Sequence, residues 1–175
     1  GPTEPTMNGG LNNTLRYKNW RLNIFVTYSF GNKIRLDPTF SSSYSDMSAM
    51  PKEFKNRWVM PGDEKITSIP AIASVRQYYN DTQLSFAYNS YNYSTERIAD
   101  GGFIRLKDVS LTYDVPRSFL SKIGLSTAAI KLDATNLCLL YADDKLNGQD
   151  PEFVNSGGVA TPLSKQFTLT VRLGL

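Results

Sequence analysis

The sequence of 175 residues has no histidine and only one cysteine, Cys138. Histidine is the commonest general base and metal ligand, so its absence excludes a Ser-His-Asp triad. A single cysteine cannot close a disulfide within the chain. No pattern places two carboxylates on neighbouring strands facing one pocket, as a glycosidase would need. We therefore predict no enzyme activity, no cofactor and no metal site.

The chain also has little excess of either charge, since 19 basic and 16 acidic residues leave a net charge of only +3. Without a concentrated basic patch, no nucleic-acid partner is expected. The chain has no run of 18 apolar residues, so no transmembrane helix is predicted, and no signal peptide is visible. A strand that crosses a membrane needs neither kind of run, because only its alternate residues touch lipid.

The last ten residues, 166–175, alternate strictly between two kinds of side chain. One parity is apolar, and the other is polar or small. An exposed strand of a soluble sandwich also alternates, but ten residues without an error favour a strand that crosses an outer membrane. The apolar residues are Phe167, Leu169, Val171, Leu173 and Leu175.

Two more alternating segments, 11–18 and 20–30, lie near the amino terminus. In the second, only Phe25 breaks the alternation. The connection around Lys18-Asn19 is so short that the two segments are predicted to form an antiparallel hairpin. Residues 1–10, with two prolines and the Gly9-Gly10 pair, are interpreted as an irregular entry.

Segments 103–115 and 127–141 complete a set of five predicted strands. Within 103–115 the apolar parity shifts by one residue near Lys107-Asp108, which a β-bulge explains. Pro116 is expected to end this strand, and residues 117–123 to form a turn of helix before the next one.

Residues 31–102 form the first of two long loops, without a strand pattern and with a short helix expected at 52–60. A structureless stretch of this length is usually functional. Its tyrosines, interleaved with asparagines, suit contact with a sugar, a peptide or a lid protein, because tyrosine offers flat apolar area and a hydroxyl. The favoured alternative is that they pack the loop onto itself. The tyrosines are Tyr78, Tyr79, Tyr88, Tyr91 and Tyr93.

Residues 142–165 form the second long loop, which is polar. Asp143, Asp144, Asp150 and Glu152, with Asn147, could bind calcium. Their spacing does not match an EF-hand, and we interpret them as solvated loop carboxylates.

The connections between the five strands are very short, very long, short and long in turn. An outer-membrane barrel keeps short turns on the periplasmic side and long loops outside, which is the order seen here. Many of the aromatic residues, 12% of the chain, lie near the ends of the alternating segments, where a membrane interface would place them. We predict an all-β fold, namely a segment of an antiparallel transmembrane β-barrel with long extracellular loops.

Several segments, in this order along the chain, resemble the carboxyl-terminal part of a SusC/RagA-type TonB-dependent outer-membrane transporter. The segment at 103–107, Phe-Ile-Arg-Leu-Lys, is the most specific. The full set is Asn13-Thr-Leu-Arg-Tyr-Lys-Asn-Trp-Arg-Leu22, residues 100–113, Asn136-Leu137, Asp150-Pro-Glu152 and Phe167-Thr-Leu-Thr-Val.

The resemblance implies a barrel of about 22 strands around an amino-terminal plug domain, in the outer membrane of a Gram-negative bacterium. It also implies a SusD-like surface lipoprotein that delivers oligosaccharide or peptide, and uptake driven by the TonB complex acting on the plug. Strands 11–18, 20–30, 103–115, 127–141 and 166–175 would then be the last strands of the barrel, with no plug domain in this sequence. Such barrels commonly end in an aromatic residue, whereas this sequence ends in Leu175.

Nine polar residues are predicted to face the barrel interior, and most of them to contact the plug rather than substrate. They are Arg16, Arg21, Asn23, Thr27, Lys131, Asp133, Thr168, Thr170 and Arg172. The rival hypothesis is a soluble, surface-bound glycan-binding β-domain that uses the tyrosines of the first loop.

Overall fold

The computed structural model describes residues 1–175 apart from 45, 46, 48, 123, 155–163 and 175. The end of the last predicted strand at Leu175 and most of the second half of the loop 142–165 therefore lie outside the described residues. The chain divides into two compact units. The sheet unit comprises residues 1–33, 100–143 and 149–175, and the loop unit comprises residues 34–99 and 144–148.

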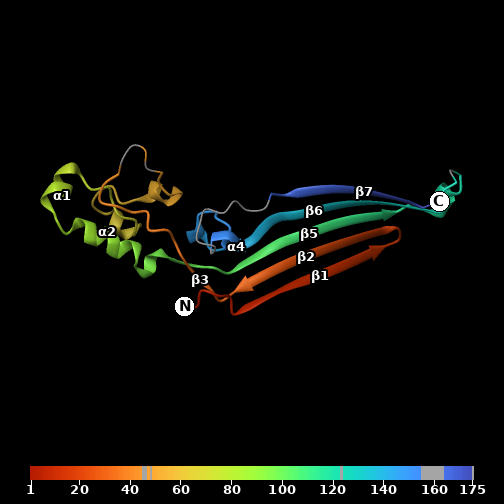
Figure 1. The fold of residues 1–175 in the computed structure, drawn as a ribbon, viewed down its shortest axis with the longest axis horizontal. Coiled ribbons are helices and arrows are strands. Elements are labelled where there is room, and N and C mark those ends of the chain that lie inside the picture. Colours follow the sequence, from red (N-terminus) through yellow and green to blue (C-terminus); the bar gives the residue numbers. More distant parts are fainter. Residues whose placement is uncertain (45–46, 48, 123, 155–163, 175) are drawn as a thin grey trace. The chain divides into compact units, whose positions relative to one another are not determined.

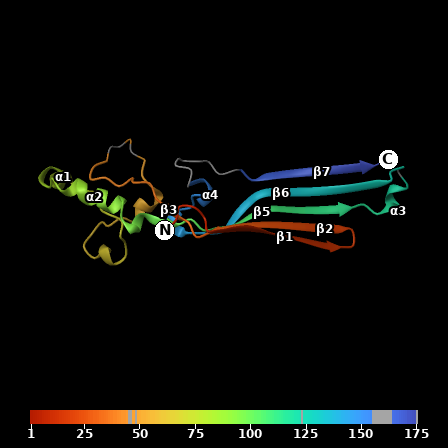
Figure 2. The same cartoon turned by 60° about the horizontal axis from the view of Figure 1, so that its bottom comes forward.

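The sheet unit contains a five-stranded antiparallel sheet, which confirms the predicted strand count and pairing (Figures 1 and 2). Its strands follow one another in the order β1-β2-β5-β6-β7. Their bounds are Met7–Tyr17 for β1, Trp20–Phe30 for β2, Phe103–Asp114 for β5, Thr127–Ala142 for β6 and Gln166–Gly174 for β7.

Strand β1 begins four residues before the predicted start at Leu11, so interpreting 7–10 as irregular was wrong. Gly9 pairs with Tyr28 and Gly10 with Thr27. A Cβ on Gly9 would lie 2.6 Å from the Tyr28 hydroxyl oxygen, and one on Gly10 would lie 2.8 Å from the Phe25 ring. The glycines thus make room for aromatic side chains of β2 rather than ending the strand.

The register aligns one leucine from each strand in a single row across the sheet. Residues directly opposite each other in antiparallel strands lie on the same face, so this row fixes the apolar face of all five strands. The row is Leu15, Leu22, Leu111, Leu132 and Leu169.

The predicted β-bulge is confirmed at Lys107. Phe25 pairs with Asp108 and Val26 with Leu106, so Lys107 has no partner on β2. On the other side, Leu106 pairs with Cys138 and Asp108 with Thr135. The bulge keeps apolar side chains on the same face before and after it, although the parity of the sequence changes there.

The loop unit is built from short helices and has its own core. The helix predicted at 52–60 is a 3₁₀ turn, η1, limited to Lys52–Asn56, and further 3₁₀ turns lie at Asp63–Lys65 (η2), Thr95–Arg97 (η3) and Asp144–Leu146 (η4). Helices α1 (Val75–Asn80) and α2 (Leu84–Asn92) were not predicted from the sequence. Ser74 and Gln77 form a capping box at the start of α1, a signal that could have located this helix.

Four other short elements lie among the described residues. Strands β3 (Lys33–Arg35) and β4 (Ile98–Asp100) form a separate two-stranded sheet. Helix α3 (Arg117–Leu120) lies where a helical turn was predicted after Pro116, and α4 (Pro151–Val154) lies in the second loop. Within the part of the chain that the structure describes, no helix has the length and hydropathy needed to cross a membrane.

Candidate functional site

The face opposite the leucine row carries the polar side chains of the sheet. Strand alternation and the register place all nine predicted interior-facing residues on this one face. Two neighbouring cross-strand rows contain most of them. The first row is Arg16, Arg21, Thr112, Lys131 and Thr170, and the second is Thr14, Asn23, Ser110, Asp133 and Thr168.

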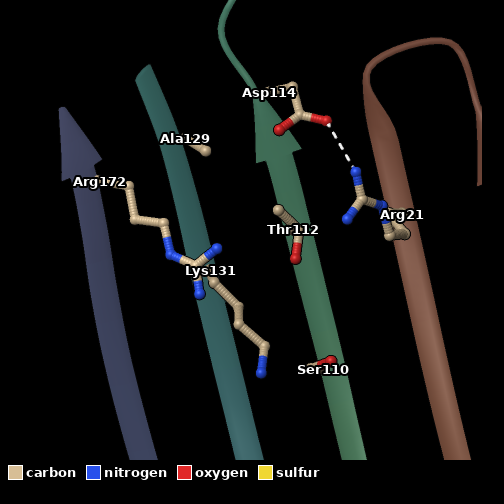
Figure 3. Close-up of a pocket in the computed structure, with 7 residues that line it drawn as sticks. All are labelled: Arg21, Ser110, Thr112, Asp114, Ala129, Lys131 and Arg172. Carbon is tan, nitrogen blue, oxygen red and sulfur yellow. Dashed lines mark hydrogen bonds and ion pairs between the residues drawn. The ribbon is translucent and has the colours of Figure 1, made fainter. Parts of the chain in front are cut away.

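A hollow of about 350 Å³ lies on this polar face, across strands β2, β5, β6 and β7 (Figure 3). Arg21, Lys131 and Arg172 supply three cations, and Asp114 supplies one carboxylate. Figure 3 shows these side chains together with two hydroxyl residues and a small residue that leaves space between them. These last three are Ser110, Thr112 and Ala129.

Only part of the positive charge in the hollow is neutralised. Arg21 Nη2 lies 3.4 Å from Asp114 Oδ2, and Lys131 Nζ lies 2.9 Å from Asp133 Oδ1. Arg172 forms no ion pair with any residue that the structure describes. Because the Arg21–Asp114 pair is half exposed, it contributes at most about 1 kcal/mol. The hollow is thus suited to hydrogen bonding and to neutralising a carboxylate.

A buried ion pair lies on the same face of β5. The guanidinium of Arg105 contacts both carboxylate oxygens of Asp150, and its Nε lies 3.2 Å from Glu152 Oε2. The Arg105 and Asp150 side chains are 6% and 5% exposed, whereas that of Glu152 is 40% exposed. The interpretation of Asp150 as a solvated loop carboxylate was therefore wrong, because it neutralises a buried arginine.

The other loop carboxylates do not gather into a metal site. The Asp143 carboxylate accepts a hydrogen bond of 2.7 Å from the Asp100 backbone N–H. Among the described residues, no group of three His, Cys, Asp or Glu side chains could hold a metal ion.

The five candidate tyrosines do not form one platform. Tyr78 and Tyr79 project from α1 and contact each other edge to face at 5.5 Å, both largely exposed. On α2, Tyr88 is buried, and Tyr91 packs edge to face against Phe40 at 5.3 Å. Burial raises the pKa of both the Tyr88 and the Tyr91 hydroxyls, so both stay protonated at neutral pH.

Tyr93, which follows α2, is exposed, and the Arg35 guanidinium lies 5.7 Å from its ring centre. The structure therefore divides the five tyrosines between packing and exposure. Those of α2 serve the core of the loop unit, and the remaining three are accessible.

Sequence reasoning missed Arg97, which organises the loop unit. Its side chain is 3% exposed, forms an ion pair with Glu53 and donates to the Asp37 carbonyl at 3.1 Å. The guanidinium also lies 4.9 Å from the Phe40 ring centre, within cation–π range. The partners are 44 and 60 residues away in the chain, so no local signal could have identified them.

Comparison with solved structures identifies proteins that share the fold of this chain. The RagAB peptide importer in its "open-open" state matches 99% of this chain with a TM-score of 0.64 and 22% identity. A second structure, of the RagAB peptide transporter, matches 98% with a TM-score of 0.65 and 23% identity. Each match covers 17% of the solved chain. At this identity the likeness establishes the fold.

The curated relatives are TonB-dependent receptors, although no family model matches the chain. TonB-dependent receptor P3 of Formosa agariphila is 30% identical over 152 residues, and receptor P39 of the same organism is 25% identical over 157 residues. These alignments cover 87% and 88% of this chain, and 13% and 14% of the relatives. The chain is a homologue of TonB-dependent receptors, as its sequence predicted, and it spans about one seventh of their length.

Proposed function

We propose that these residues form the carboxyl-terminal wall of a SusC-like TonB-dependent importer of oligosaccharides or peptides in the outer membrane of a Gram-negative bacterium. The observation that carries this proposal is the two-faced sheet. Its leucine row is open, with Leu15, Leu132 and Leu169 exposed by 57%, 55% and 64%. Its opposite face carries the charged hollow. A soluble protein rarely leaves so large an apolar surface uncovered.

In this proposal the leucine row meets acyl chains and the polar face meets the aqueous interior. The plug domain of the same transporter would lie against the charged hollow. The free edges of β1 and β7 would pair with neighbouring strands and so close a barrel of about 22 strands, because unpaired backbone groups are too costly in hydrocarbon.

Aromatic side chains at both ends of β2 support a membrane position. Trp20 packs against Tyr113 with ring centres 4.6 Å apart, and at the far end Phe30 lies 6.2 Å from both Tyr28 and Tyr141. The ten residue-to-residue steps from Trp20 to Phe30 span about 34 Å of strand. A tilt of about 40° reduces this to about 26 Å, close to the apolar band of outer-membrane barrels.

The long loops 31–102 and 142–165 would lie outside the cell, where they would contact a SusD-like lipoprotein and the arriving substrate. The TonB complex would act through the plug and not through these residues. RagAB, whose structures share this fold, is a peptide importer, which supports a peptide or an oligosaccharide of similar size as the substrate.

Membrane extraction tests the proposal against a soluble glycan-binding domain. The full-length receptor should be recovered only from the outer-membrane fraction with detergent, and its lipoprotein partner should co-purify with it. Recovery of a folded monomer containing this chain in plain buffer would exclude the transporter.

A further inference from the structure

The loop unit contains a groove that none of the predicted site residues except Tyr88 helps to form. It has a volume of about 580 Å³, within the range of roughly 300 to 1,000 Å³ found for ligand sites. One wall is Arg57, Trp58 and Val59, and the other is the segment 71–74. Gln77, Leu84 and Tyr88, from α1 and α2, complete the lining.

The first wall is held in place by a tight turn. The Asp63 carboxylate accepts hydrogen bonds of 3.0 Å from the backbone N–H groups of Val59 and Met60. The Trp58 indole N–H donates to Glu64 at 3.1 Å. The hydrogen bond from the Met60 N–H has the largest effect on the pKa of Asp63, and that from the Val59 N–H the second largest. Both lower this pKa, so the Asp63 carboxylate stays charged at neutral pH. A wall fixed before binding loses less entropy when a ligand arrives.

In the second wall, Ile72 is the residue whose backbone is open to a ligand. Residues 71–74 belong to no helix or strand. The Tyr88 hydroxyl donates to the Ala71 carbonyl, which holds the segment against α2. The N–H and C=O of Ile72 form no hydrogen bond with any described residue. An uncovered backbone of this kind can pair with an extended peptide, as sheet edges do in strand-addition complexes.

The side chains in the groove suit an apolar residue with a nearby negative charge. Val59 and Ile72 are 63% and 46% exposed, and they line the groove together with the partly buried Leu84. The Arg57 guanidinium lies 4.8 Å from the Phe54 ring centre and donates to the Phe54 carbonyl at 3.3 Å. Arg57 has no carboxylate partner among the described residues, so its charge is available to a ligand.

From this geometry we propose that the groove binds an extended peptide, with its backbone along Ile72, an apolar side chain between Val59 and Leu84, and a carboxylate near Arg57. The proposal rests on the importer function proposed above and narrows its substrate from oligosaccharide or peptide to peptide. A neutral oligosaccharide has no aliphatic side chain to place against Val59 and Leu84 and no carboxylate to place near Arg57, whereas a peptide has both.

Binding to the full-length receptor in detergent tests the groove. The probe is a dansyl-labelled hexapeptide of alternating alanine and leucine with a free carboxyl terminus. Ile72→Asp should weaken its binding about tenfold or more, because it places a charge in the apolar part of the groove. Ile66→Asp is the matched control, because Ile66 is 84% exposed in the same unit and does not line the groove. Equal affinities for the two variants would overturn the proposal.

A second variant tests the charge. Arg57→Gln should weaken the free-acid peptide about fivefold to tenfold and leave its carboxyl-terminal amide unaffected, while Arg57→Lys restores most of the affinity. An equal loss for both peptides would contradict the placement of the carboxylate.

A transport assay with a linear oligosaccharide of glucose distinguishes a failure of the groove proposal from a failure of the importer proposal. If the receptor transports the oligosaccharide and does not bind the peptide, the groove assignment fails while the importer stands. If peptide binding depends on Ile72 but the receptor is recovered without detergent, the groove stands and the importer fails.

Discussion

The loop unit and the sheet unit treat their apolar side chains in opposite ways. Apart from Pro151, seven apolar side chains are buried among the described residues, and six of them belong to the loop unit: Ile34, Leu36, Phe40, Tyr88, Ala99 and Leu146. The seventh, Leu120, lies in α3. In the sheet unit the apolar residues of β1, β6 and β7 remain largely exposed.

The difference indicates two different surroundings. The loop unit folds as a soluble protein does, with apolar groups inside, and it stabilises the buried Arg97 and Asn92 by ion pairing and hydrogen bonding. The sheet has one apolar face and one polar face and no core between layers. Such a sheet is stable only where each face meets the solvent that suits it, and in the proposed barrel the leucine row would meet lipid.

The largest expected effect is in the loop unit, at its buried arginine. Arg97→Ala should destabilise this unit by about 3–5 kcal/mol, because Glu53 is left without its partner in a site that is only 15% exposed. Hydrogen exchange on the full-length receptor should show faster exchange in residues 34–99. Arg76→Ala, at an exposed position, is the control and should change little. Uniform loss of protection across the sheet as well would contradict the division into two units.

A charge on either face of β7 tests the contrast between the two sheet faces. Leu169→Arg should cost about 2–4 kcal/mol near the membrane midplane, as judged by urea unfolding of the receptor in lipid vesicles. Thr168→Arg, one residue earlier, should be tolerated because Thr168 pairs with Asp133 on the polar face. Thr27→Arg is a poorer control, since Thr27 pairs with the buried Arg105. If both β7 variants cost the same, a soluble two-sided core would be the better explanation.

A substitution on β6, opposite the bulge in β5, should have a smaller effect that is confined to the sheet. Asn136 has a φ of 54° on β6, in the left-handed region that disfavours branched side chains. Asn136→Val should destabilise the sheet by about 1–2 kcal/mol in the same unfolding assay, whereas Asn136→Gly should be near neutral. A tolerated valine would show that the backbone can relax at this bulge.

The smallest effect should follow from acid in the loop unit. Because the folded pKa of Asp63 is lowered, its contribution to stability is complete above the ordinary carboxyl pKa and is lost as pH falls through the folded value. The amides of Val59 and Met60 should therefore keep their protection between pH 7 and 5 and lose it only at lower pH, as hydrogen exchange would detect. Asp63→Asn should remove this pH dependence.

Features that depend on local alternation could be predicted from the sequence. The hairpin at Lys18-Asn19, the bulge at Lys107 and the side of the sheet on which Arg21 or Leu169 lies all follow from counting residues. The start of β1 was misplaced, because a Gly-Gly pair is typical of a turn. Here the two glycines instead leave space for the aromatic rings of β2, a contact that the local sequence does not reveal.

The candidate sites were less predictable. Which tyrosines pack and which stay accessible depends on α1 and α2, two short helices that gain stability from tertiary contacts. The burial of Asp150 depends on Arg105, 45 residues earlier in the chain.

The sequence by itself determined that each strand has two faces, because successive side chains of a strand point to opposite sides whatever their neighbours are. Only the tertiary structure decided which residues meet: five leucines in one row, three cations around one hollow, and Arg97 between Glu53 and Phe40. These meetings join residues far apart in the chain, and their stability depends on burial and pairing that appear only once the chain has folded.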